Sequence, residues 1–125
     1  ALIVIQQAVS LENYERTGDI INAKINTRLI ENIFFKNSPL HDGALIISDG
    51  MLSAAGCIMP VSHDTSLPRY LGLRHRAALG IVQATDAIAI VVSEETGNIS
   101  LAYKGQLYTK LNSTDLEQRI AKITI

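Results

Sequence analysis

The sequence predicts an α/β fold: a single globular domain with a central mixed β-sheet flanked by helices on both faces. Two dipeptides, Asp49-Gly50 and Lys104-Gly105, each lie between short apolar runs, which is typical of β-hairpins. Segments 26–35, 70–84 and 114–123 repeat apolar residues at helical spacing. The chain has 125 residues, a usual length for one domain. Hairpins combined with helices argue against a plain doubly wound parallel sheet.

The first half of the chain contains four predicted strands, a helical turn and a helix. The strands are 1–6, 20–25, 44–48 and 51–57, and the helical turn at 10–14 is closed by Gly18. The helix over 26–35 has Asn26 or Thr27 as its cap. Its apolar face consists of Leu29, Ile30, Ile33 and Phe34, and Asn37-Ser38-Pro39 ends it.

The second half begins with a polar loop, 60–68, and continues into a helix within 70–84. The strand predicted at 87–92 is apolar throughout, which is typical of a central position in a sheet. Strands 99–103 and 106–110 form the second hairpin. The last helix begins near Thr114, where Thr114 and Glu117 match a capping box. The apolar faces of the two helices are Ala77, Ala78, Ile81 and Val82 in the first, and Leu116, Ile120 and Ile123 in the second.

Composition and charge argue against several classes of protein. Hydrophobic residues make up 47% of the chain and charged residues 18%, which is typical of a folded domain rather than a disordered one. The net charge of −1, from 11 basic and 12 acidic residues, argues against broad binding to nucleic acid. Cys57 is the only cysteine, so neither a disulfide nor a thiolate zinc site is predicted, and a reducing compartment fits. No apolar run has the length of a membrane span.

The first candidate motif is Leu40-His41-Asp42-Gly43-Ala44, at the entry to a predicted strand. Asp-Gly is a frequent turn dipeptide, so a plain turn explains the pair when it is taken alone. Its place at a strand edge, with His41 beside it, favours chemistry. A carboxylate at Asp42 can hold a divalent metal or accept a proton from a ribose hydroxyl, and Gly43 lets a ligand approach the backbone. His41 can serve as a metal ligand or a proton carrier.

The second candidate motif is Gly72-Leu73-Arg74-His75-Arg76-Ala77, at the start of a predicted helix. A solvated helix start explains it on composition alone. Arginine is unfavourable in a first turn, however, because the helix dipole favours anions there. A bound phosphate would resolve the conflict by accepting from backbone N–H groups and guanidinium forks. Arg74 and Arg76 point in different directions on a helix, so one can reach a ligand while the other braces the site or a partner chain.

The third candidate motif, Ser93-Glu94-Glu95-Thr96, follows the apolar strand at the end where ligands bind in α/β sheets. Ser93 can bind phosphate, and Glu94 or Glu95 can help to hold a metal, although a polar turn before Gly97 explains the segment equally well. No nucleophile elbow, phosphate loop or Gly-x-Gly-x-x-Gly occurs, so a nucleotide would be bound by another scheme. Met59, Tyr70 and Leu71 fit the core better than a base-stacking pocket, and His63 and Asp64 fit a solvated loop.

The triplets Asp42-Gly43-Ala44 and Arg74-His75-Arg76 together resemble the signature pair of diadenylate cyclase domains, which make cyclic di-AMP from two ATP molecules. Segments 37–41, 54–57 and 91–97 also resemble this family. The resemblance extends from residue 1 to about residue 107. Each triplet alone is unspecific, whereas both in this order, with three flanking segments, are specific. The resemblance implies that residues 1–125 form a diadenylate cyclase catalytic domain.

The resemblance also implies a catalytic, substrate-binding or metal-binding role for each site residue. Two domains face each other as a homodimer, so that the 3′-hydroxyl of one ATP attacks the α-phosphate of the other and pyrophosphate leaves. Adenine would lie against Ile58, Met59 and Leu71. The implied catalytic residues are Asp42, Arg74, His75 and Arg76. The other substrate-binding residues are Gly43, Ala44, Leu73, Ser93 and Glu94. The implied metal ligands are His41, Asp42 and Glu95, for manganese or alternatively magnesium or cobalt.

One departure from the family pattern concerns the residue before Arg-His-Arg. The family usually has threonine there, and this chain has Leu73, so a hydroxyl contact with phosphate or metal is lost. Ser93 could take over that contact. Leu73 also keeps open a second function, a nucleotide sensor on the same fold without turnover. A metal-dependent phosphohydrolase built on His41, Asp42 and Glu95 ranks below both, because it leaves the arginines unexplained.

The start of the chain indicates which type of diadenylate cyclase it resembles. It begins without Met, inside a strand-like run, and has no signal peptide. We expect a cytoplasmic domain whose upstream membrane helices are absent from this sequence, as in the membrane-anchored bacterial cyclic di-AMP synthase. The DNA-scanning type carries a long helical region after the cyclase domain, and this chain stops soon after that domain.

Overall fold

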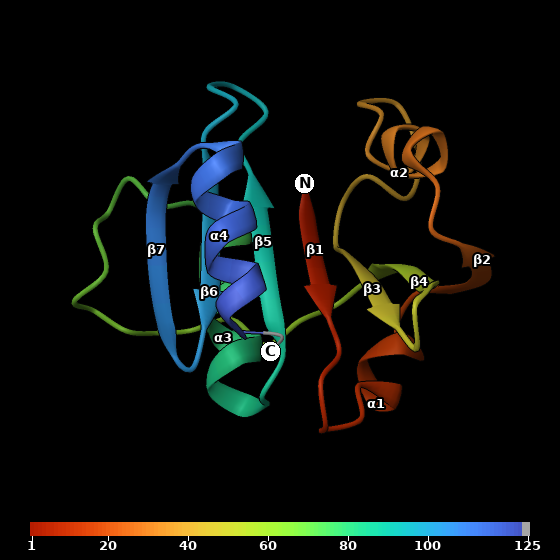
Figure 1. Cartoon of the computed structure of the whole chain (residues 1–125), viewed down its shortest axis with the longest axis horizontal. Coiled ribbons are helices and arrows are strands. Elements are labelled where there is room, and N and C mark those ends of the chain that lie inside the picture. Colours follow the sequence, from red (N-terminus) through yellow and green to blue (C-terminus); the bar gives the residue numbers. More distant parts are fainter. Residues whose placement is uncertain (124–125) are drawn as a thin grey trace.

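Seven strands form one mixed sheet in the order β2-β4-β3-β1-β5-β6-β7 (Figure 1). The structure is a computed structural model and describes residues 1–123. The predicted fold class, an α/β domain with a mixed sheet, is confirmed. The strands are β1 (Leu2–Ile5), β2 (Asp19–Lys24), β3 (Ala44–Ser48), β4 (Met51–Cys57), β5 (Ile88–Val92), β6 (Ile99–Tyr103) and β7 (Gln106–Leu111).

Two tight hairpins supply two of the five antiparallel strand pairs, β3 with β4 and β6 with β7. Asp49-Gly50 joins β3 to β4, and Lys104-Gly105 joins β6 to β7, as predicted. In both turns the two central residues have positive φ, 52° and 72° in the first and 50° and 73° in the second. Such a turn has a twist that matches the twist of paired strands. Strand β1 lies between the hairpins, parallel to β3 and antiparallel to β5.

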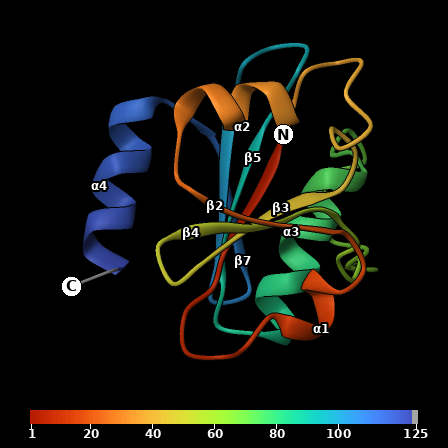
Figure 2. The ribbon, with the colours of Figure 1, turned by 90° about the vertical axis from the view of Figure 1, so that its right-hand side faces the viewer.

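Helices cover both faces of the sheet, as predicted (Figure 2). The larger part of the core lies under α3, where Ala78 and Ile81 pack with Val4 of the central strand. A smaller core lies on the opposite face, where Ile33 of α2 packs with Leu45. Helices α1 (Glu12–Glu15) and α3 (Leu73–Ala84) lie on one face, and α2 (Thr27–Ile33) and α4 (Ser113–Ile123) lie on the other.

Helix α2 begins as predicted and ends early. The N–H of Leu29 donates to Asn26 Oδ1 at 3.1 Å, so Asn26 is the cap. The helix ends at Ile33, two residues before the predicted end. Phe35 is 60% exposed and has no core to pack against, so nothing at that position favours a further turn.

The predicted capping box of α4, Thr114 with Glu117, is wrong. Asn112 is the cap: the N–H of Asp115 donates to Asn112 Oδ1 at 2.8 Å, and the N–H of Asn112 donates to Asp115 Oδ2 at 3.3 Å. Asn112 and Asp115 thus form a reciprocal capping box two residues before the predicted one. The helix therefore begins at Ser113.

The loops that carry the three motifs lie at one edge of the sheet, the edge formed by the ends of its strands. Strands β1 and β3 begin at this edge and β5 ends at it, at the top of Figure 1. Gly43 makes the approach of the first loop possible, because its φ is +87° and an added Cβ would lie 2.8 Å from the Cys57 carbonyl oxygen. Glycine tolerates both conditions and other residues do not.

Candidate active site

The three motifs meet around one cleft of ≈ 660 Å³. The loop before β3, the first turn of α3 and the loop after β5 each supply one wall. This volume is in the range of small-molecule sites, about 300–1,000 Å³. The lining residues are Asp42, Gly43, Tyr70, Gly72, Leu73, Arg74, His75, Val91, Val92, Ser93, Glu94 and Glu95.

Arg74 lies at the centre of the cleft, between two carboxylates. Its Nη2 is 3.4 Å from Asp42 Oδ1 and 3.3 Å from Glu94 Oε1. The side chain of Arg74 is 34% exposed and that of Asp42 is 81% exposed, so solvent screens these contacts and they add little stability. Their importance is geometric, because they hold the guanidinium group of Arg74 at the point where the first two motifs and the loop after β5 meet.

His41 stands beside Asp42 in a defined tautomer. Its Nδ1 is 2.7 Å from the carbonyl oxygen of Ser38, which can only accept, so we assign the proton to Nδ1. Its Nε2 then carries a lone pair and lies 3.5 Å from Asp42 Oδ1. A ring nitrogen and a carboxylate oxygen facing each other can share a proton or hold a cation.

His75 lines the same cleft from the first turn of α3. Burial lowers the pKa of His75 below its ordinary value. The ring is therefore neutral at pH 7, and it adds hydrogen-bonding capacity to the cleft without a second positive charge next to Arg74.

The loop after β5 is a tight turn closed by its own hydrogen bonds. The N–H of Gly97 donates to the Ser93 carbonyl at 3.0 Å, and the N–H of Thr96 donates to Ser93 Oγ at 3.4 Å. Glu94 pairs with Arg74, whereas Glu95 lines the cleft and forms no ion pair within residues 1–123.

An apolar hollow of ≈ 190 Å³ adjoins the cleft and shares Gly43, Leu73 and Arg74 with it. Ile58 and Met59, both predicted to contact adenine, line this hollow together with Val61. Leu71, the third predicted adenine contact, and Ala44, predicted to bind substrate, lie in the core: Leu71 is 7% exposed, Ala44 is fully buried, and neither lines the cleft or the hollow.

Tyr70 is a cleft residue that the sequence reasoning missed. It was expected in the core, but it is 72% exposed and lines the cleft. Its position two residues before Gly72, the residue that precedes α3, was the available signal. Arg76 shows the opposite behaviour, since it lies outside the cleft and donates from Nη1 to the Asp64 carbonyl at 3.3 Å.

The three predicted metal ligands do not form a complete metal site. Within residues 1–123, no group of three or more His, Cys, Asp and Glu side chains is arranged to hold a metal ion. His41 and Asp42 are adjacent, and Glu95 lies elsewhere on the cleft wall. Magnesium-like ions often bind through one or two carboxylates and complete their coordination with substrate phosphates and water. The donors present fit that kind of binding.

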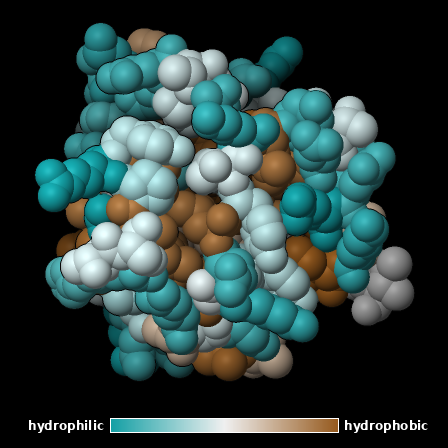
Figure 3. Space-filling view, turned by 90° about the vertical axis from the view of Figure 1, so that its left-hand side faces the viewer, coloured by the Kyte–Doolittle hydropathy of each residue, from teal (hydrophilic) through white to brown (hydrophobic). Residues whose placement is uncertain are grey.

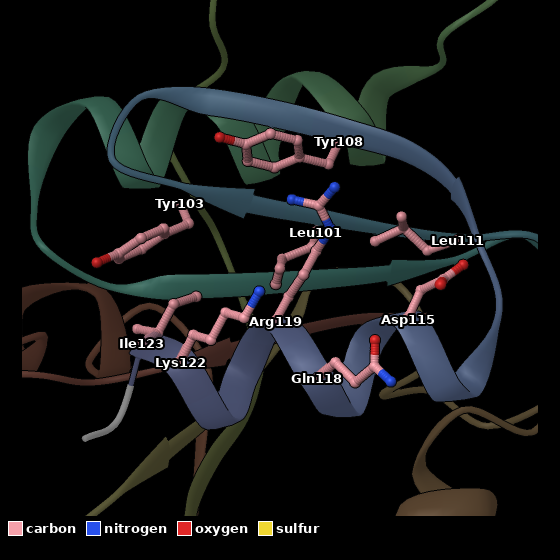
Figure 4. Close-up of a pocket in the computed structure, with 9 residues that line it drawn as sticks. All are labelled: Leu101, Tyr103, Tyr108, Leu111, Asp115, Gln118, Arg119, Lys122 and Ile123. Carbon is pink, nitrogen blue, oxygen red and sulfur yellow. The ribbon is translucent and has the colours of Figure 1, made fainter.

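A second groove lies away from the three motifs, between α4 and strands β6 and β7 (Figure 4). It measures ≈ 500 Å³, and Arg119 crosses it to place its guanidinium 4.4 Å from the centre of the Tyr108 ring. Seen from the β7 side, the surface shows separate apolar areas among polar side chains (Figure 3). None of the predicted site residues lines this groove.

An α/β domain with a guanidinium group in a cleft at one sheet edge, next to an apolar hollow, suits a nucleotide-binding class of protein. Comparison with known families agrees, and the chain belongs to the DisA bacterial checkpoint controller nucleotide-binding family, whose model matches residues 1–107. The resemblance to diadenylate cyclases that the motifs indicated is confirmed.

Two curated relatives carry related names. Cyclic di-AMP synthase CdaA of Bacillus subtilis is 42% identical over 120 residues, which are 96% of this chain and 44% of that protein. A diadenylate cyclase of Listeria monocytogenes is 45% identical over 122 residues, 98% of this chain and 45% of that protein. The chain thus spans less than half the length of these relatives.

Two solved structures share the fold. A double mutant of DacA from Staphylococcus aureus superposes with a TM-score of 0.94 at 38% identity, over 98% of this chain and 81% of that one. A hypothetical membrane spanning protein from Bacillus cereus superposes with a TM-score of 0.84 at 42% identity, over 90% of this chain and 55% of that one. None of the helices in residues 1–123 combines the length and apolar character needed to cross a bilayer.

Proposed function

We propose that residues 1–125 are a catalytic domain that condenses two ATP molecules into cyclic di-AMP and releases pyrophosphate. The observation that carries the proposal is the position of Arg74, between Asp42 and Glu94 and next to an apolar hollow. The names of the relatives support it, since they are described as diadenylate cyclases and cyclic di-AMP synthases.

Each part of the site suits one part of ATP. The apolar hollow with Ile58 and Met59 suits the adenine ring, and Gly43, which lines both the hollow and the cleft, suits the ribose at their junction. Arg74 and the first turn of α3 suit the phosphates. Gly72 gives that helix no side-chain cap, so N–H groups of the first turn remain available to an anion. Neutral His75 adds a further hydrogen-bonding group, and Ser93 lies on the opposite wall.

Asp42 is the residue we assign to the attacking hydroxyl. Its carboxylate accepts the proton of the 3′-hydroxyl while the oxygen forms a bond to the α-phosphorus of the second ATP, and the bond to pyrophosphate breaks. His41 and Asp42 would hold a divalent metal, with Glu95 as a further donor. When bound, such an ion neutralises phosphate charge and lowers the pKa of the coordinated hydroxyl.

The proposed reaction needs two domains, because the two reacting groups belong to two bound ATP molecules. We propose a homodimer with two-fold symmetry in which the clefts face each other. Three exposed apolar side chains support this arrangement: Ile58, Tyr70 and Leu73 are 68%, 72% and 70% exposed, and all line the hollow or the cleft. Activity should therefore rise more than linearly with protein concentration at low concentration.

The experiment is incubation with ATP and manganese, followed by detection of cyclic di-AMP by mass spectrometry, with magnesium and cobalt as parallel arms. Asp42→Asn should abolish product and keep the melting temperature. Asp49→Asn is the matched control, because it makes the same chemical change in a hairpin turn away from the cleft. Absence of product from the unmodified chain at high concentration would refute the proposal, and turnover by Asp42→Asn would refute the role of Asp42.

A second candidate function is a nucleotide sensor, which Leu73 favours because the chain lacks the hydroxyl expected there. It predicts binding of ATP or cyclic dinucleotide by calorimetry without product. Release of AMP or phosphate in the same assay would instead indicate hydrolysis.

We also propose that the protein acts at the cytoplasmic side of a membrane. The Bacillus cereus neighbour supports this location, since it is described as membrane spanning. Fractionation of the protein expressed from its own gene tests it, and recovery only in the soluble fraction would contradict it.

A further inference from the structure

The two arginines of Arg74-His75-Arg76 have different surroundings. Arg74 contacts the carboxylates of the cleft, whereas Arg76 turns to the outer side of α3. There it meets residues 60–71, the segment between β4 and α3, which we call the strap. The strap extends as a wide loop beyond β7 in Figure 1, and Figure 2 places it on the side of α3 that faces away from the sheet. The interior side of α3 is occupied by the core, so the helix lies between sheet and strap.

Arg76 holds the strap with both its side chain and its backbone. Its Nη1 donates to the carbonyl oxygen of Asp64 at 3.3 Å. Its own carbonyl accepts from the N–H of Ser62 at 2.9 Å, and Ser62 is buried. Both hydrogen bonds go to backbone groups, so they depend on the path of the strap. The pKa of Asp64 is lowered mainly by hydrogen bonds from Ser66 and also by the charge of Arg76, which adds an electrostatic attraction to the same segment.

Gly80 allows the strap to lie directly on the helix. It follows Arg76 by one turn and so lies on the same side of α3. A Cβ added at Gly80 would be 2.7 Å from the carbonyl carbon of Pro60, closer still to its oxygen, and 3.1 Å from the nitrogen of Ser62. Any larger residue at this position must push the start of the strap away from α3.

The strap connects the two parts of the proposed ATP site. Its first residues follow Ile58 and Met59, and Val61 of the strap lines the apolar hollow with them. Its last residues lead through Tyr70 to Gly72, and both of these line the cleft. A displacement of the strap therefore moves a wall of the hollow and a wall of the cleft together.

We propose that Arg76 is a positioning residue, which sets the shape of the ATP site through the strap and does not contact the phosphates, and that Gly80 is its partner in this role. The proposal rests on the proposed function for its kinetic consequences. Its structural part, the attachment of the strap by Arg76, stands independently of turnover.

The structural part is tested by hydrogen exchange of the strap in the absence of ATP. Loss of one hydrogen bond from a charged donor favours local opening, so Arg76→Ala should exchange about tenfold faster over residues 60–71. Arg76→Lys should restore most of the protection, because its ammonium can donate to the same carbonyl. Arg74→Ala and Arg28→Ala should leave the strap unchanged, and Arg28 is a matched control because it is an exposed arginine on the opposite face.

The kinetic part is tested by a double-mutant cycle on Arg76 and Gly80. Arg76→Ala and Gly80→Ala should each raise KM for ATP about tenfold while kcat changes by no more than about twofold, since neither touches the reacting atoms. The double variant should resemble the worse single variant, because both changes release the same segment. Arg76→Lys should recover most of the wild-type KM.

The outcomes separate this proposal from the proposed function. If the unmodified chain makes no cyclic di-AMP, the proposed function fails, and hydrogen exchange still decides the role of Arg76. Unchanged exchange of the strap in Arg76→Ala overturns the proposal. So does a double variant whose effect on KM is the product of the two single effects. If Gly80→Ala does not fold, Arg76→Ala is compared with Arg76→Lys instead, and equal KM values for these two variants overturn the proposal.

Discussion

Replacement of Leu73 by threonine should make the domain a better enzyme. Leu73 is the first residue of α3 and lies between the cleft and the apolar hollow. It occupies the position at which the resemblance to diadenylate cyclases predicts a hydroxyl. In the proposed complex a threonine hydroxyl there would donate to a phosphate oxygen, which the leucine side chain cannot do.

The substitution should lower the stability of the fold and raise kcat/KM. Leu73 is 70% exposed, so the loss of its packing costs about 0.5–1 kcal/mol, and the weaker helix propensity of threonine costs about 0.5 kcal/mol. We therefore expect the melting temperature to fall by about 3–6 °C. A hydrogen bond to a charged group contributes about 1.5–3 kcal/mol, which corresponds to a rise of roughly 10- to 150-fold in kcat/KM.

The assay is kcat/KM for cyclic di-AMP formation, measured for Leu73→Thr and for Leu73→Val. Valine has the branched shape of threonine without the hydroxyl, so the difference between the two variants isolates the hydroxyl. Both variants should show the same loss of melting temperature. If Leu73→Thr is no more active than Leu73→Val, the hydroxyl does not reach the phosphates and the reasoning is wrong.

Two further predictions concern titrating groups near the motifs. Burial lowers the pKa of His75 in the folded chain, whereas in the unfolded chain this pKa is near 6.5. The unfolded chain therefore binds the proton more readily, and the free energy of unfolding should decrease as the pH falls below 6.5. Urea unfolding between pH 7.5 and pH 5 should show a smaller decrease in His75→Gln, and an equal decrease would contradict the assignment. Burial raises the pKa of Cys57 to about 11, so its thiol should resist alkylation at pH 8 until urea unfolds the chain, whereas rapid reaction of the native protein would show that the thiol is accessible.

The parts of the fold that sequence predicts well are those with local causes. Asp49-Gly50 forms a hairpin because aspartate and glycine both tolerate positive φ, whereas in Lys104-Gly105 only the glycine does so readily and the pairing of β6 with β7 holds Lys104 at a φ of 50°. Asn26 caps α2 for an equally local reason. The meeting of the motifs has no such local cause: the first precedes β3 and the third follows β5, and only the pairing of both strands with β1 brings these loops to one edge.

The parts that sequence did not predict depend on residues far apart in the chain. Tyr70 is of a residue type that often lies in the core, and only the path of the strap places it on the cleft wall. Arg76 is of a residue type that often binds phosphate. Only the close packing of Pro60 on Gly80 brings the backbone carbonyl of Asp64 within its reach. The order of the seven strands is likewise a property of the whole sheet.

Because the Arg76 side chain points away from the cleft, the cleft has fewer positive charges than the motifs alone suggest. Without Arg76, the residues that line the cleft include three carboxylates, Asp42, Glu94 and Glu95, against one guanidinium, Arg74, while His75 is neutral at pH 7. Such a cleft repels a bare triphosphate, although the motifs alone offer two arginines for it. A divalent cation that accompanies the triphosphate would reverse this repulsion, since the carboxylates then become its ligands or its counter-charges. In the proposed function the metal is therefore needed for binding ATP as well as for activating its hydroxyl.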